Sequence, residues 1–322
     1  MAGELRLAEH PDFKTLVARS SAKHSVPEPW VEKDYYLTEV LRIVAQAHPT
    51  EGFLKGGTSL TKGWALLTRM SEDIDWVLMR SAFTPNLGGK EVNARLEGLA
   101  GAVAKHPNLA LAKSRTFVVD GKARHDYYDY KTAMATHTLG LAETIKLEAG
   151  TRAGIWPLEK RPIQSLVGIT AESLGQGDVA DDVTGFPMLV LDFRRTFVEK
   201  LVAVHGFVDR FVNGGAPLAR DARHYADLHV LLQRDEVRAL VGGAEFGAIL
   251  DEQDALAKEH FKKNYVPLPK SFRDSQALFP VQDLAEKLKK QYEDDVRPLF
   301  FGSTMPSFEA VLSSFVAIKD RL

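Results

Sequence analysis

The sequence contains no cysteine, which excludes a disulfide framework, a thiolate zinc site and a cysteine nucleophile. It also contains no apolar run close to the ~20 residues that a membrane-spanning helix requires. The amino-terminal stretch, MAGELRLAEHPDFKTL, mixes charges throughout and lacks the apolar core of a signal peptide. We therefore expect a cytoplasmic protein that does not associate with a membrane.

A large charge of one sign is absent as well. Lysine and arginine total 41 against 43 for aspartate and glutamate, giving a net charge of −2, so any surface that binds nucleic acid has to be local. The ten histidines are scattered, and the chain has no pair at metal-ligand spacing, no P-loop and no internal repeat. What is present is a chain of 322 residues with 45% hydrophobic content, enough for two packed domains.

The most informative stretch runs from Leu54 to Met79. It begins in a short strand that ends at a Gly56-Gly57 turn, continues through a helical pattern and ends in a second strand that carries Asp73 and Asp75. Side chains two apart on a strand point to the same face, so the two carboxylates share a face while their apolar neighbours are buried. Such a pair can hold two Mg²⁺ ions, with Mn²⁺ as an alternative, about 4 Å apart for phosphoryl transfer.

The glycine turn fits the same chemistry. Without Cβ atoms, Gly56 and Gly57 let a triphosphate approach the backbone, and Thr58 and Ser59 would open a helix whose free N–H groups favour phosphates. Neither motif is specific alone, and a solvated acidic strand after an ordinary turn is the alternative. Their combined order, with one helix between Gly-Gly-Thr-Ser and Asp-x-Asp, is much more specific. It resembles the signature of the DNA polymerase β-like nucleotidyltransferase superfamily.

Hydrophobic periodicity predicts the neighbouring elements. The expected helices are Asp12–Ser20, Trp30–Ala47 and Glu91–Lys105, and the expected strands are Leu111–Val119, Tyr127–Thr132 and Thr144–Ala149. In the second helix, Glu32, Lys33 and Asp34 suit a charged first turn that interacts with the helix dipole. The alternative is that Lys33 or Asp34 reaches the nucleotide site.

The strand Thr144–Ala149 carries another acidic residue. Its apolar side chains face one way, and Lys146 and Glu148 face the other. Glu148 can therefore supply a third carboxylate and metal ligand beside Asp73 and Asp75. A strand with one polar face is an equally good interpretation of the same alternation.

The Gly- and Asp-rich segment Gly175–Pro187 predicts a loop, and we place a domain boundary after it. Residues 1–188 would form a domain with a mixed sheet and amino-terminal helices, and residues 189–322 a mostly helical domain, giving an α+β protein. In the helical half, Lys200 lies at the edge of an apolar stripe, where it either extends to solvent or binds a triphosphate. Periodicity alone makes Asp227 a solvated charge.

These segments together resemble the AbiEii/AbiGii toxin family of nucleotidyltransferases, which includes toxins that act on tRNA. The resemblance spans nearly the whole chain in the family's order. The matching segments are VEKDYYLTEVL at Val31, LKGGTSLTKGWALLTRMSEDID at Leu54, IKLEAG at Ile145, RRTFVEKLVAVH at Arg194, RDARHYADLHVL at Arg220 and PSFEAVLSSF at Pro306.

The resemblance implies a polymerase β-like fold whose helical domain completes the active site. It implies metal binding by Asp73 and Asp75 and triphosphate binding by the Gly-Gly-Thr-Ser turn. Contrary to the periodicity, it also implies that Lys200 and Asp227 are active-site residues. Positions matching the family at Lys62 and Arg69 imply phosphate contact or orientation.

The expected activity is transfer of a nucleoside monophosphate from an NTP to an acceptor hydroxyl, with release of pyrophosphate. The resemblance favours the 3′ end of tRNA as acceptor, which would block aminoacylation and translation, and a cognate antitoxin as partner, acting by binding or indirectly. One alternative is a protein hydroxyl as acceptor. Another is a nucleotide-binding protein that works by interaction and has lost turnover.

Overall fold

A computed structural model describes residues 5–134, 141–154, 157–218, 220–301 and 305–322 of the chain. The chain divides into two units: one runs to Ala65 and from Met70 to Leu191, and the other comprises Leu66–Arg69 and everything from Asp192 onward. The predicted boundary after residue 188 falls inside the last strand of the sheet, Phe186–Leu191. That strand was missed because Pro187 and the preceding glycines favour a loop.

The first unit is built on a mixed sheet, as the sequence predicted. In the described residues its strands follow the order β3-β5-β6-β2-β1-β8-β7, with β4 paired to β5. Two pairs, β2 with β6 and β1 with β8, are parallel, and the others are antiparallel. The strands are β1 Gly52–Lys55, β2 Asp73–Leu78, β3 Leu109–Leu111, β4 Phe117–Val119, β5 Ala123–Tyr130, β6 Thr144–Gly150, β7 Leu158–Ile163 and β8 Phe186–Leu191.

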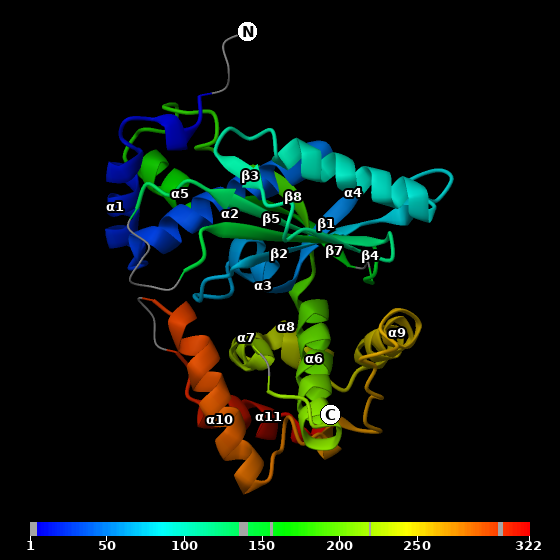
Figure 1. The fold of residues 1–322 in the computed structure, drawn as a ribbon. Coiled ribbons are helices and arrows are strands. Elements are labelled where there is room, and N and C mark those ends of the chain that lie inside the picture. Colours follow the sequence, from blue (N-terminus) through cyan, green and yellow to red (C-terminus); the bar gives the residue numbers. More distant parts are fainter. Residues whose placement is uncertain (1–4, 135–140, 155–156, 219, 302–304) are drawn as a thin grey trace. The chain divides into compact units, whose positions relative to one another are not determined.

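Helices cover the two faces of this sheet unequally. Figure 1 shows α2 and α4 lying along one face, where they contact β5, β6 and β8, and the short helical turn α3 on the other side beside β2. The helices of this unit are α1 Phe13–His24, α2 Glu28–Ala47, α3 Gly56–Thr58, η2 Ser59–Gly63, α4 Gly89–Val103 and α5 Leu166–Ser173. The face without long helices is therefore the one on which polar side chains can gather.

Helix α2 is the central helix of this unit, and almost its whole circumference is buried. It begins at Glu28, with Pro27 before it and Pro29 in its first turn, because proline fixes the backbone torsion that a helix start needs. Glu32 and Asp34 therefore lie beyond the first turn and are buried. The interpretation of these residues as a charged first turn is wrong.

Several element boundaries also differ from the prediction. The single strand expected from Leu111 to Val119 is two short strands, β3 and β4, separated by a turn, and β5 starts at Ala123 instead of Tyr127. Strand β7 and helix α5 were not predicted, since β7 is half polar and its apolar positions are few. These differences lie outside the Gly-Gly and Asp-x-Asp motifs.

The second unit is helical. Asp192 caps α6 by accepting a hydrogen bond from the backbone N–H of Arg194, and Gly215 ends the helix in the left-handed conformation. The core of this unit includes Phe197, Tyr225 and Phe315. Its helices are α6 Phe193–Gly214, α7 Arg223–Leu231, α8 Asp235–Leu240, α9 Ala244–His260, α10 Gln282–Val296 and α11 Phe308–Val316. Over the described residues, no helix is long and apolar enough to span a membrane.

Candidate active site

Strand β2 presents Asp73 and Asp75 on one face of the sheet. Both side chains are half-buried, whereas Ile74 and Trp76 between and beyond them are fully buried on the opposite face. This alternation is the one expected of a strand with period two. Two carboxylates two residues apart thus point to the face of the sheet that α2 and α4 leave uncovered.

The neighbouring strand places Glu148 beside Asp75. In the parallel pair of β2 and β6, Asp75 is registered with Glu148 and Asp73 with Lys146, so the four side chains share a face. The carboxylate of Glu148 forms a close ion pair with Lys146, and its other oxygen lies 3.7 Å from Nδ1 of His125 on β5. Burial opposes the charge of Lys146, but the hydrogen bond and charge of Glu148 raise its pKa above the ordinary value.

Gly56 brings the backbone of the turn against Asp75. Its φ is +71°, in the left-handed region that glycine adopts at little cost, and a Cβ atom built there would lie 2.2 Å from Oδ2 of Asp75. Any other residue at this position would have to displace this carboxylate and adopt an unfavourable φ. The sequence predicted that a triphosphate approaches the backbone of this turn, and the structure shows in addition that the backbone of Gly56 lies against Asp75.

The hydroxyl groups of Thr58 and Ser59 point into the protein. Thr58 Oγ1 lies 2.8 Å from Ser71 Oγ and donates a close hydrogen bond to the carbonyl of Asp73, and Ser59 Oγ donates to the carbonyl of Gly56 at 2.8 Å. Both side chains are fully buried. The two hydroxyls therefore tie the turn to β2, and any phosphate contact at this turn would come from backbone N–H groups.

Lys62 is also held by the protein. Its ammonium donates to Oδ1 of Asp34 at 2.6 Å and to the carbonyl of Gln164 at 2.9 Å, while the other oxygen of Asp34 accepts from the backbone N–H of Leu166 at 2.8 Å. These bonds join α2, η2 and the start of α5. The helix expected between the two motifs is present as the helical segment Gly56–Gly63, and irregular backbone follows it up to Asp73.

A second cluster of charges lies within the helical unit. The guanidinium of Arg69 donates two parallel hydrogen bonds to the carboxylate of Asp227, from Nε to Oδ1 and from Nη2 to Oδ2, both 2.6 Å long. Lys200 Nζ lies 2.8 Å from Oδ2 of the same carboxylate and 3.1 Å from Nδ1 of His224. Asp227 is completely buried, so its interpretation as a solvated charge is wrong. Helical periodicity could not reveal this because the partners come from other segments.

The protonation states in this cluster follow from burial and mutual charge. Burial disfavours the charge of Asp227, but Arg69 and Lys200 hold its pKa well below the ordinary value. Burial lowers the pKa of Lys200, an effect that Asp227 opposes and Arg69 reinforces. Burial and the charge of Lys200 lower the pKa of His224 to about 4, so its ring is neutral near pH 7. The site therefore combines one carboxylate with two cations and a neutral imidazole.

Asp73, Asp75 and Glu148 lie on one face of the sheet, which we call the carboxylate face. It suits a divalent cation that is bound by the protein and a substrate together. Within the described ranges, no three histidine, aspartate or glutamate side chains converge as a complete metal site. Mg²⁺ usually binds through one or two carboxylates plus substrate phosphates instead of an all-protein cage. Asp73 and Asp75 are such a pair, and Glu148, which is paired with Lys146, lies beside Asp75 in the sheet.

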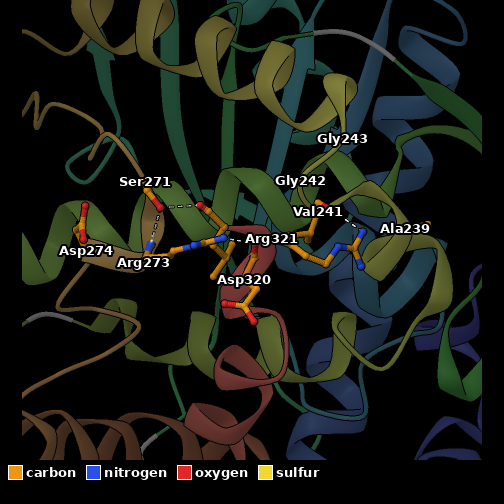
Figure 2. Close-up of a pocket in the computed structure, with 10 residues that line it drawn as sticks. Ala239, Val241, Gly242, Gly243, Ser271, Arg273, Asp274, Asp320 and Arg321 are labelled. Atoms are coloured by element: carbon orange, nitrogen blue, oxygen red, sulfur yellow. Dashed lines mark hydrogen bonds between the residues drawn. The ribbon is translucent and has the colours of Figure 1, made fainter.

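The helical unit also contains a cavity of about 680 Å³ between the segments around Gly242, Ser271 and Arg321. Figure 2 shows that several of its polar side chains are bonded to the backbone: Arg321 donates to the carbonyl of Val241 at 2.7 Å, and Ser271 donates to that of Leu322 at 2.8 Å. Arg273 is bound to the carbonyl of Asp320. These bonds give the cavity walls a structural role, and none of the candidate site residues lines it.

Comparisons with known proteins identify the family and a similar fold. A sequence profile described as the AbiEii nucleotidyl transferase toxin of type IV toxin-antitoxin systems matches residues 40–314. The structure resembles that of MenT4, a nucleotidyltransferase toxin from Mycobacterium tuberculosis H37Rv, with a TM-score of 0.58 and 17% identity over 96% of this chain and 90% of that chain. No match was found among curated proteins.

The matching family is one of nucleotidyltransferases, an enzyme class that uses an NTP and divalent metal ions. The chain belongs to the AbiEii family of toxins from type IV toxin-antitoxin systems. The resemblance noted in the sequence is thereby confirmed.

Sequence analysis missed His224. It lies three residues before Asp227 on α7, and its Nδ1 is 4.0 Å from Oδ2 of that carboxylate. The spacing of three would have placed both side chains on one face of the helix, so the signal was present once Asp227 was taken as a site residue.

Proposed function

We propose that this enzyme transfers a nucleoside monophosphate from an NTP to the 3′ hydroxyl of tRNA in the cytoplasm, with Mg²⁺ as the metal, and so blocks aminoacylation. The observation that carries the proposal is the joint placement of Asp73 and Asp75 on one sheet face with the backbone of Gly56 against Asp75. This arrangement supports the proposal because it puts two carboxylates that can hold metal ions beside the backbone of the turn.

The three carboxylates of this face have distinct proposed parts in the reaction. Asp73 and Asp75 would hold the metal ions, which when bound neutralise charge on the α-phosphate and the leaving pyrophosphate. The acceptor oxygen forms a bond to the α-phosphorus while the bond to the bridging oxygen of pyrophosphate breaks. Glu148, beside Asp75 in the sheet, is the candidate to receive the proton of the attacking hydroxyl or to complete the metal site.

The residues of the turn position this face. Gly57 and the backbone N–H groups that follow it are the proposed triphosphate contacts, and the buried hydroxyls of Thr58 and Ser59 keep that backbone in place. Lys62 acts on the same segment through Asp34. The contribution of these residues is orientation, on which phosphoryl transfer depends strongly.

The helical cluster supplies positive charge to the same reaction. Lys200 is the proposed phosphate contact, since an ammonium ion is a compact point charge suited to a triphosphate. Asp227 fixes the position of the Lys200 ammonium and favours its protonated state, and Arg69 holds the same carboxylate in place. Replacing Asp227 or Arg69 is therefore expected to lower the rate of nucleotidyl transfer, because Lys200 would no longer be held in place.

The proposal is tested by incubating the purified protein with total tRNA, Mg²⁺ and each α-labelled NTP in turn, beside an Asp75→Ala variant. We expect label in tRNA with at least one NTP and none with the variant, and the active NTP identifies the donor. Label that appears in protein when the same reactions are run in cell lysate, with none in tRNA, would contradict the tRNA acceptor while retaining the chemistry.

The family also makes a cognate antitoxin the expected partner, acting directly or indirectly. Co-expression with the antitoxin followed by affinity purification of the toxin decides between the two. Recovery of a stoichiometric complex establishes direct binding, and a free toxin with growth restored establishes an indirect mechanism.

A further inference from the structure

Aromatic side chains continue the carboxylate face outward along the sheet. The register pairs Asp75 on β2 with Glu148 on β6, Glu148 with His125 on β5, and His125 with Phe117 on β4. Residues paired in this way lie on the same face of a sheet. A single row therefore leads from Asp75 to Phe117 across three strand spacings, a span of roughly 14 Å.

A second ring lies in the adjacent row. Tyr127 on β5 is registered with Lys146 on β6, which is registered with Asp73 on β2. Strand β4 pairs antiparallel with β5. We call Phe117, His125 and Tyr127 the ring strip.

The arrangement of the ring strip allows a flat ligand, such as a nucleic-acid base, to stack on it. The rings of Phe117 and His125 are stacked, with centroids 4.4 Å apart and planes 23° from parallel, and Phe117 remains 48% exposed. Tyr127 has the guanidinium of Arg115 at 5.3 Å and the ammonium of Lys146 at 5.9 Å from its ring centroid. Of the three rings, Phe117 is exposed, and His125 and Tyr127 are partly buried. An exposed ring beside cations is a usual component of single-stranded nucleic-acid sites, where bases stack on rings and cations contact the backbone.

The position of the strip relative to the glycine turn decides which nucleotide it serves. Gly56 follows β1, which pairs with β2 on one side, while β6, β5 and β4 extend from the other side. In an in-line displacement, the attacking oxygen and the leaving pyrophosphate lie on opposite sides of the α-phosphorus. With the triphosphate at the glycine turn, the acceptor approaches over β6, from the side of the ring strip.

We infer that the ring strip binds the unpaired bases at the 3′ end of the acceptor RNA, by stacking a base on the exposed ring of Phe117, which His125 supports from its other face, while the terminal hydroxyl reaches the carboxylate face. The inference rests on the proposed function, since it requires a nucleic-acid acceptor. A span of three strands is longer than one nucleoside, so the stacked base is one that precedes the terminal nucleotide. Lys146 and Arg115 flank the path of the backbone.

The test compares Phe117→Ala and His125→Ala with a matched control, Val118→Ala. Val118 is the next residue on β4, is 47% exposed, and is registered with Arg124 on the opposite face of the sheet. Nucleotidyl transfer to tRNA is measured over a range of tRNA and of NTP concentrations. Independently of turnover, each variant is also made with Asp75→Ala and titrated with a short single-stranded RNA that carries 2-aminopurine next to its terminal nucleotide, whose fluorescence is quenched on stacking.

We expect Phe117→Ala to raise the KM for tRNA about tenfold, with the KM for NTP within twofold of the unaltered enzyme, and to remove the 2-aminopurine quench. His125→Ala is expected to raise the KM for tRNA and weaken the 2-aminopurine quench as well. Phe117→Trp, which keeps an aromatic ring, should retain the KM and the quench of the unaltered enzyme, and Val118→Ala should change neither. An unchanged KM for tRNA and quench in Phe117→Ala, or a rise in the KM for NTP alone, would overturn the inference. Failure of the unaltered enzyme to label any RNA would count against the proposed function, and the fluorescence titration would still decide whether the strip stacks RNA bases.

Discussion

At the scale of single residues, Gly56 is the position where backbone and chemistry are most tightly joined. Gly56→Ala is expected to displace the carboxylate of Asp75, because the added Cβ would lie 2.2 Å from Oδ2 and the φ of +71° is unfavourable for alanine. A displacement of about 1 Å at a reacting centre can lower the rate about 100-fold. Nucleotidyl transfer rates measure this loss. Gly89→Ala, where a Cβ meets nothing within 4 Å, is the control and retains full activity.

Asp227 is the residue on which the helical cluster depends. Asp227→Asn removes the charge of the carboxylate that pairs with the buried guanidinium of Arg69 and ammonium of Lys200, and the removal of one partner from a buried pair costs about 3 to 5 kcal/mol. Urea unfolding of the isolated protein measures the loss. Asp235→Asn, whose side chain is 92% exposed, is the comparison and should change the unfolding midpoint little. Equal midpoints for the two variants would contradict the buried pairing.

His224 predicts a pH dependence of stability. Its pKa falls from 6.5 to about 4 through burial and the charge of Lys200, while Asp227 on α7 opposes the shift and Arg223 adds to it. Between pH 6.5 and 4 the unfolded chain binds a proton that the folded chain does not, so this contribution to stability is complete above pH 6.5 and lost as the pH falls towards 4. Thermal unfolding at pH 7 and pH 5 should show a larger decline for the unaltered protein than for His224→Gln. Parallel declines would refute it.

At the scale of elements, the decisive connection is between the glycine turn and β2. Thr58→Val keeps the shape of the side chain and removes the hydroxyl that bonds the carbonyl of Asp73 and the hydroxyl of Ser71. A buried acceptor left without its donor costs about 1 to 3 kcal/mol, and Asp73 loses its backbone support. We expect lower thermal stability and at least about tenfold slower transfer, since positioning governs the rate. Thr58→Ser, which keeps the hydroxyl, should retain the stability and the transfer rate. A fully active Thr58→Val would show that the turn does not depend on these hydrogen bonds.

Local alternation was enough to predict strand β2 and the common face of Asp73 and Asp75. The same reasoning failed for α2, where proline starts the helix earlier and Asp34 is buried against Lys62. It also failed for Asp227, whose partners Arg69 and Lys200 come from distant segments. Periodicity reports burial by a neighbouring apolar surface, and it cannot report burial that is compensated by charges brought together by the fold.

At the scale of the whole molecule, the chain carries two charged groupings, the carboxylate face in the sheet unit and the Arg69–Asp227–Lys200 cluster in the helical unit. The short segment Leu66–Arg69 belongs to the helical unit although the chain on both sides of it belongs to the sheet unit. No spacing rule predicts such an excursion, because it depends on tertiary packing. Membership of the family, in contrast, followed from motifs spread along the chain.

The central proposal, addition of a nucleotide to the 3′ end of tRNA, is tested most directly by the mass of that end. After reaction with Mg²⁺ and NTP, the tRNA is digested with a ribonuclease and its 3′ terminal fragment is weighed by mass spectrometry. We expect the fragment to gain the mass of one or more nucleoside monophosphates, with no gain for Asp75→Ala or for tRNA whose terminal ribose was first oxidised with periodate. A gain that persists on oxidised tRNA, or an unchanged fragment beside labelled protein, would contradict the proposal.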